Sequence, residues 1–276
     1  MPELPEVQTI VDALKKSIVG KKIKLVKIDS SRVFSQNTTF LKKGLKRQKI
    51  TDIKRRGKFI IINFSQNQSL LIHLGMTGGI FYSRKNHPQK KHDHLIMEFA
   101  DGTQIRYHDP RKFGKVKRLD SSKIDKAPEI AKLGPEVFEI SPREFVEILR
   151  KRKGRIKTAL LNQKVLAGLG NIYSDEALFD AKIHPLTKAD KLKEKRLLKL
   201  HRSIQKILKK AIKAGGSSMN DYLKIDGEKG LFQFQHRVYR REGKPCKRCR
   251  TKIKRIRISQ RSSFFCPRCQ KLRTPP

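Results

Sequence analysis

Apolar residues near the start of the chain recur with the period of a helix. Five of them fall on one face of a 3.6-residue repeat: Val7, Ile10, Val11, Leu14 and Ile18. Pro5 and Glu6 suit a first helical turn, and Gly20 suits a stop. The pattern therefore predicts an amphipathic helix over residues 3–19.

Between residues 24 and 119 the pattern changes to short apolar or alternating runs, which are typical of β-strands. These runs cover residues 24–28, 50–53, 59–64, 70–74 and 95–99. An Asp101-Gly102 turn leads from the last run to Ile105 and Tyr107, as in a hairpin. We expect an antiparallel β domain here.

Beyond residue 125 we expect the strands to stop and helices to dominate. Ser141-Pro142-Arg143-Glu144 has the form of a capping box with proline at the first helical position, and it predicts a helix over 145–150. Further helices are expected near Ile156, near Ser174 and over 189–214. Residues 223–235, which contain two glycines, are predicted to form a loop.

All the cysteines lie near the end of the chain. Cys246 and Cys249 form one C-x2-C pair, and Cys266 and Cys269 form another after a sixteen-residue gap. This spacing suits tetrahedral zinc. Two structural disulfides are the alternative, but nothing in the sequence indicates an oxidising compartment. We expect one structural Zn²⁺, and four thiolates leave it no open position for chemistry.

The charge balance points to a polyanionic partner. The 276 residues include 66 Lys or Arg against 25 Asp or Glu, a formal net charge of +41, which makes nucleic acid the leading candidate. Residues 241–276 alone carry thirteen basic residues against Glu242, as expected of a phosphate clamp. A hydrophobic content of 37% argues against a wholly disordered chain.

The sequence indicates neither a membrane protein nor a secreted one. No run approaches the roughly 18 apolar residues that a membrane span requires. The first residues carry two acids and no cationic leader. A cytoplasmic location is therefore expected.

The N-terminus could supply a nucleophile. Removal of Met1 would leave Pro2 with a secondary amine of pKa about 7.7 to 8, partly neutral at pH 7. Such an amine can attack a sugar C1′ and form a cationic iminium. Glu3 and Glu6 could act as general acid and base. Spacing alone favours a plainer interpretation, in which Pro2, Pro5 and the acids only start a helix.

Seven collinear motifs change that weighting. They occupy residues 1–7, 56–58, 73–78, 91–94, 108–114, 162–163 with 167–176, and 264–270. Together they resemble the formamidopyrimidine-DNA glycosylases, bacterial enzymes that remove 8-oxoguanine and ring-opened purines. The resemblance implies an α+β multidomain fold: an N-terminal antiparallel β-sandwich flanked by helices (1–130), a helix-two-turns-helix domain with a lesion loop (131–235) and a C-terminal zinc finger (236–276).

The resemblance also assigns catalytic roles. It implies that Pro2 attacks C1′ of a flipped nucleotide and that Glu3 protonates the ribose oxygen, after which β- and δ-elimination remove both phosphates. Lys58 matches the family lysine that contacts the phosphate and assists near the lesion. Arg261 matches the finger arginine that meets the phosphates flanking the lesion.

Further residues match positions that hold DNA. Met76, Arg111 and Phe113 match the trio that fills the void left by the flipped nucleotide, with Arg111 facing the orphaned cytosine. The resemblance implies DNA contacts for four residues: His92, Arg111, Lys157 and Asn171. The implied partner is double-stranded DNA that contains oxidised purines or abasic sites, bound by a monomer.

The chain departs from the family pattern in the finger region. Arg240, Arg250, Gln260 and Ser262 stand where the family usually has glycine, at turns that often need a positive φ. Residues 215–222 occupy the place of the family loop that folds over the damaged base. Ser217, Ser218 and backbone amides of that loop are candidates to read the base.

Two other functions fit parts of the sequence. A related endonuclease VIII type prefers oxidised pyrimidines, but Leu4 and Val7, with both Arg111 and Phe113, favour the purine enzyme. A non-catalytic zinc protein that binds damaged DNA fits the charge equally well. The Pro2, Glu3 and Lys58 set argues against it.

Overall fold

The computed structural model describes residues 1–29, 31–34, 37–84, 88–219 and 222–272. The chain forms two compact units. The first contains residues 1–131 and 214–233, and the second contains 132–213 and 234–276. Residues 214–233 thus return to the first unit, whereas the sequence interpretation grouped them with the helices of 131–235.

The first unit is built on two antiparallel four-stranded sheets. One sheet has the order β1 (Ile23–Ile28), β6 (Asp93–Phe99), β7 (Thr103–His108), β5 (Gly79–Arg84). The other has the order β2 (Ile50–Arg56), β3 (Phe59–Phe64), β4 (Gln68–His73), β8 (Lys115–Asp120). Three helices and two 3₁₀ turns accompany them: α1 (Leu4–Ile18), α2 (Thr38–Leu45), α3 (Pro128–Ala131), Ser31–Val33 and Ser121–Lys123.

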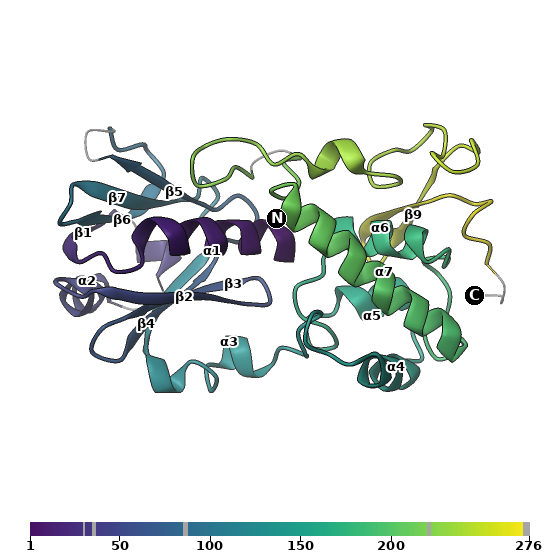
Figure 1. Cartoon of the computed structure of the whole chain (residues 1–276), viewed down its shortest axis with the longest axis horizontal. Coiled ribbons are helices and arrows are strands. Elements are labelled where there is room, and N and C mark those ends of the chain that lie inside the picture. Colours follow the sequence, from purple (N-terminus) through teal and green to yellow (C-terminus); the bar gives the residue numbers. More distant parts are fainter. Residues whose placement is uncertain (30, 35–36, 85–87, 220–221, 273–276) are drawn as a thin grey trace. The chain divides into compact units, whose positions relative to one another are not determined.

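Helix α1 contacts both sheets, as can be followed in Figure 1. Its five predicted apolar positions are all buried, in one core with side chains such as Ile53 and Ile62 of one sheet and Met97 and Ile105 of the other. β-branched residues dominate this core because they pack well on a pleated surface. The predicted helix and β-sandwich are confirmed.

The second unit is mainly helical. Its helices are α4 (Pro142–Arg150), α5 (Ile156–Leu161), α6 (Asn171–Asp180) and α7 (Glu194–Lys213). A 3₁₀ turn over Phe232–Gln235 includes the point at which the chain passes from the first unit to the second. The predicted capping box is present: the Ser141 N–H donates to Glu144 Oε2 at 3.0 Å, and the Glu144 N–H donates to Ser141 Oγ at 3.2 Å. Helix α4 therefore begins where the sequence indicates.

Two predictions for this unit were wrong. The long helix starts at Glu194 rather than near residue 189, because the Ala189 N–H donates to the Gly154 carbonyl at 2.9 Å and the Asp190 N–H to that of Arg152 at 3.2 Å. Strands also recur after residue 125: β9 (Lys254–Ile258) and β10 (Arg261–Phe265) form an antiparallel hairpin.

The β9–β10 turn is strained. Ser259 and Gln260 have φ values of 45° and 61°, the pair of left-handed residues that a type I′ turn requires. Such a conformation costs a residue with a Cβ roughly 1–2 kcal/mol. We expect Ser259→Asn with Gln260→Gly to slow amide hydrogen exchange in β9 and β10 by about fivefold, a gain of about 1 kcal/mol. Arg257→Gly, in the strand itself, should speed that exchange, and an unchanged rate for the turn variant would contradict the prediction.

Candidate active site and zinc finger

The start of α1 is held by a buried carboxylate. Glu6, only 1% exposed, accepts the Glu3 N–H on Oε2 at 2.8 Å and the Ser217 N–H on Oε1 at 2.8 Å. A Cβ on Gly216, whose φ is +80°, would lie 2.9 Å from Glu6 Oε1, so this close approach needs glycine. Glu6 thereby ties the start of α1, beside buried Pro2, to the segment 214–233.

That segment also bonds to itself. The Ser218 N–H donates to Gln233 Oε1 at 3.0 Å, and Ser218 Oγ accepts the Gly230 N–H at 2.8 Å. The predicted lesion loop of 215–222 includes Asn220 and Asp221, which lie outside the described residues. Base reading by Ser217 and Ser218 stays a prediction, and the Ser217 N–H is occupied by Glu6 in this structure.

Lys58 lies in the turn between β2 and β3 and is 6% exposed. Its charge acts on His73, whose ring is tilted by 52° against that of Phe59, with 4.8 Å between centroids. Burial, and then the Lys58 charge, lower the pKa of His73 from 6.5 to about 4. His73 Nδ1 accepts the Gly75 N–H at 3.1 Å, which requires the neutral ring. His73 therefore adds no positive charge beside Lys58 at neutral pH.

This geometry predicts a pH dependence of stability. Because the folded pKa of His73 lies near 4 and the unfolded pKa near 6.5, the unfolded state binds more protons between these values, and stability falls as the pH falls from 6.5 to 4. His73 contributes at most about 3 kcal/mol to this fall. We expect His73→Gln, which keeps an acceptor for Gly75, to flatten the dependence in urea unfolding of the first unit. A parent and variant with parallel pH profiles would exclude this role.

The three predicted void-filling residues lie together. Met76 is 43% exposed and Phe113 is 53% exposed. The Arg111 guanidinium carbon lies 4.5 Å from the Phe113 ring centre, and Arg111 Nη1 lies 3.7 Å from Met76 Sδ. Large apolar side chains are left exposed at a site that the sequence assigned to the DNA stack. Their insertion into DNA stays a prediction.

His92 lies among other imidazoles. Its ring centroid is 5.8 Å from that of His108 and 6.4 Å from that of His94. The His92 carbonyl accepts the Asp109 N–H at 3.0 Å. These contacts show His92 packed against His94 and His108. Its contact with the DNA backbone stays a prediction.

In the second unit, Lys157 is not a surface cation. It is 0% exposed, lies 2.6 Å from Asp175 Oδ1 and donates to the Ser262 carbonyl at 3.2 Å. Asn171 Nδ2 donates to the same carbonyl at 2.9 Å. Both residues therefore hold the residue next to Arg261, which is itself exposed. The predicted phosphate contact of Lys157 stays a prediction; in this structure its ammonium group is buried and pairs with Asp175.

Sequence reasoning missed the two acids that hold the finger region. Asp175 accepts the Phe264 N–H at 2.9 Å, and burial raises the pKa of Asp175 to about 7 in spite of the Lys157 charge. Glu176 Oε1 accepts the backbone N–H groups of residues 237–239 at 2.9 to 3.0 Å. Membership of the motif 167–176 was the one signal that marked them.

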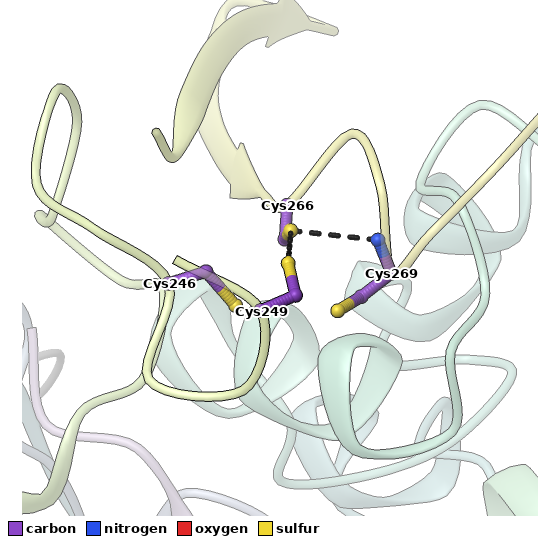
Figure 2. A group of neighbouring side chains, drawn as sticks. All are labelled: Cys246, Cys249, Cys266 and Cys269. Atoms are coloured by element: carbon purple, nitrogen blue, oxygen red, sulfur yellow. Dashed lines mark hydrogen bonds between the residues drawn. The ribbon is translucent and has the colours of Figure 1, made fainter. Parts of the chain in front are cut away.

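The four cysteines converge, as Figure 2 shows. Their sulfur atoms lie within 4.8 Å of one another, and among the described residues they form the one group that could hold a metal ion. The Arg248 N–H points at Cys246 Sγ and the Cys269 N–H at Cys266 Sγ, each at 3.4 Å. Such amide bonds to sulfur stabilise thiolates, so the donor set fits a closed structural zinc site.

Three of the four non-glycine residues that replace family glycines have a positive φ. Arg240, Arg250 and Gln260 all have positive φ, at 53°, 65° and 61°. Ser262 does not, because it lies within β10. This chain thus tolerates backbone strain at three turns of the finger region.

The fold and site define the class as a basic, α+β zinc-finger protein. Residues 1–116 match the formamidopyrimidine-DNA glycosylase N-terminal domain, 133–222 match the H2TH domain of the same enzymes, and 243–272 match a zinc finger found in FPG and IleRS. The chain belongs to the formamidopyrimidine-DNA glycosylase family. The predicted resemblance, the fold class and the zinc site are confirmed.

Relatives match over nearly the whole chain. The formamidopyrimidine-DNA glycosylase of Solibacter usitatus is 44% identical, covering 98% of this chain and 100% of the relative, and that of Ligilactobacillus salivarius is 41% identical, covering 98% and 99%. A Lactococcus lactis Fpg bound to abasic-site DNA is 40% identical with a TM-score of 0.92, covering 98% of this chain and 100% of that one. In the described part of the present chain, no helix is long and apolar enough to cross a membrane.

Proposed function

We propose that this protein excises oxidised purines from duplex DNA and cleaves the resulting abasic site, with the amine of Pro2 as nucleophile once Met1 is removed. Family membership makes it a DNA glycosylase and abasic-site lyase. The observation that carries the proposal is the start of α1, where Pro2 and Glu3 are buried and Glu6 fixes the backbone beside them.

The reaction needs one amine and one acid at this place. The Pro2 nitrogen forms a bond to C1′ while the bond from C1′ to the base breaks. The base leaves with its electron pair and takes up a proton, and the Pro2 nitrogen gives up its N–H proton. Glu3 donates a proton to the ribose ring oxygen as the ring opens, which leaves an iminium. The iminium withdraws electrons, so loss of the 2′ proton expels the 3′ phosphate and a second elimination expels the 5′ phosphate.

Solved relatives support a damaged-DNA substrate. Lactococcus lactis Fpg was solved with DNA containing an abasic site and, as a mutant, with DNA containing Fapy-dG. The same protein was also solved with DNA containing an oxidised pyrimidine. A net charge of +41 on this chain suits a DNA backbone. Purine and pyrimidine lesions therefore need direct comparison.

We expect the protein to nick a duplex containing 8-oxoguanine without added metal ion, at least about tenfold faster than one containing thymine glycol. The physical reason is that the chemistry uses an amine and a carboxyl group, and the zinc site is closed. Single-turnover product formation measures both rates. Faster cleavage of thymine glycol would favour the endonuclease VIII type, and binding without any nicking would favour the non-catalytic alternative.

We further propose that the protein acts as a monomer in the cytoplasm, at the chromosome. Four free cysteines near one another suit a reducing compartment, and a solved relative binds DNA that contains an abasic site. Sedimentation equilibrium with and without a lesion duplex measures the stoichiometry. A two-to-one complex at low protein concentration would contradict the monomer.

A further inference from the structure

The void-filling residues come from two separate loops. Met76 lies in the loop that follows β4, and Arg111 and Phe113 lie in the loop between β7 and β8. Both loops belong to the first unit. To fill one void in the DNA, the side chains of Met76, Arg111 and Phe113 need fixed positions relative to one another. Something in the structure has to fix the two loops against each other.

Asp109 meets both loops. It is 0% exposed. Its Oδ1 accepts the Thr77 hydroxyl at 2.6 Å and the Arg111 N–H at 3.3 Å. Its Oδ2 accepts the Gly114 N–H at 2.8 Å and the Tyr107 hydroxyl at 3.3 Å. One buried carboxylate thus bonds directly to a neighbour of Met76 and to both sides of Phe113.

The surroundings keep this carboxylate in place. The Asp109 carbonyl accepts His94 Nε2–H at 2.9 Å and the Lys112 N–H at 3.2 Å. Burial and the Asp109 charge raise the pKa of Tyr107, so its hydroxyl remains a donor. The four groups that bond to the two side-chain oxygens of Asp109 are all hydrogen-bond donors, which matches the acceptor character of these oxygens.

The loops also touch through their backbones. A Cβ on Gly75 would lie 2.6 Å from Gly114 N and from the Phe113 carbonyl carbon. A Cβ on Gly114 would collide with the Tyr107 hydroxyl. Real Cβ atoms do not approach so closely, so both glycines are needed for the contact. Asp109 Oδ2 accepts the N–H of Gly114, one of the two glycines in this contact.

We propose that Asp109 is a positioning residue that couples the Met76 loop to the Arg111–Phe113 loop, so that the void-filling residues enter DNA as one unit. The proposal rests on the proposed function. Asp109 touches neither the reacting atoms nor Pro2 in the described contacts. We therefore expect Asp109 to affect how the void-filling residues enter the DNA stack and recognise the opposite base. We do not expect it to affect the chemistry of the Pro2 amine.

Thr77→Val is the sharpest test, because it removes one hydroxyl from the coupling and keeps the side-chain shape. Asp109→Asn replaces one of the two oxygens that face donors with an NH2 group, which donates and cannot accept. Thr103→Val is the matched control: Thr103 Oγ1 donates to Asp101 at 2.7 Å in the same unit, in a different turn. Each variant is assayed for excision of 8-oxoguanine opposite cytosine and opposite adenine, and for borohydride trapping on single-stranded abasic DNA.

In the parent protein, excision should be faster opposite cytosine, because the Arg111 guanidinium can meet the O2 and N3 acceptors of cytosine. Thr77→Val and Asp109→Asn should each lower the cytosine-to-adenine ratio by about fivefold, the value of one buried hydrogen bond. Single-stranded abasic DNA has no base stack for the void-filling residues to hold open. Trapping of each variant on this DNA should therefore stay within about twofold of the parent protein. Thr103→Val should leave both readouts unchanged.

A parent-like ratio in folded Thr77→Val would overturn the proposal, and so would an equal loss in excision and trapping. Amide hydrogen exchange of residues 75–78 and 110–114 supplies a readout that needs no activity. It should quicken in both loops of Thr77→Val and in neither loop of Thr103→Val. If the parent protein cleaved no DNA, the proposed function would fail, and the exchange data would still decide whether Asp109 couples the loops.

Discussion

Borohydride should trap this protein on abasic duplex DNA through the nitrogen of Pro2, and peptide mapping should place the crosslink there. A covalent sugar adduct needs an amine that is neutral near pH 7. A terminal α-amine with a pKa of about 7.7 to 8 reaches that state easily, whereas an ordinary lysine with a pKa of about 10.4 does not. The lysines of this chain therefore compete poorly with one terminal amine.

Lys58 is the competitor to exclude, since it is the lysine with a motif-based reason to lie near the lesion. Lys58→Ala should release base more slowly and still crosslink to an abasic site. Pro2→Gly keeps a primary amine and should retain partial trapping. A variant that retains Met1 should lose trapping by at least about a hundredfold. A crosslink mapped to Lys58, or full trapping with Met1 retained, would overturn the mechanism.

Local patterns predicted the elements that carry a strong periodic signal. The apolar stripe of residues 7–18 predicted helix α1, and the capping-box sequence Ser141 to Glu144 predicted the start of α4, where the structure has the reciprocal bonds. Strands β9 and β10 were missed because β9 consists of Lys254, Arg255 and Arg257 alternating with two isoleucines, a run in which charge hides the period. The start of α7 depends on backbone bonds between 189–190 and 152–154, which no local pattern reveals.

In the candidate site, too, some features were predictable from sequence motifs and others depend on contacts that only the fold creates. The grouping of Met76, Arg111 and Phe113 and the cysteine cluster both follow from motifs. The burial of Lys157 could not be predicted, because its partner Asp175 lies elsewhere in the chain and a lysine is rarely buried. The role of Asp109 is equally invisible in the sequence, since its partners come from both loops and become neighbours only in the fold.

The finger should depend on its metal ion. Its apolar cluster is small, with Val238, Ile253 and Phe264 among its buried members, so four thiolates on one Zn²⁺ must supply much of the stabilisation. Cys249→Ala should therefore unfold the β9–β10 hairpin and weaken DNA binding at least about tenfold, because residues 241–276 carry a net charge of +12 that binds phosphate as one surface. Far-ultraviolet circular dichroism should keep the signal of α4 to α7.

Lys244→Ala is the matched control for that loss, since it removes one exposed finger charge and no zinc ligand. It should lower the dependence of log K on log salt by about one unit at most, whereas Cys249→Ala should lower it by several. Titration of lesion duplex at a series of salt concentrations measures both slopes. Less than about half an equivalent of zinc in protein purified without chelator would argue against a structural ion. Equal slopes of log K against log salt for the two variants would show that the basic residues of the finger bind DNA independently of one another, without a fold that depends on the metal ion.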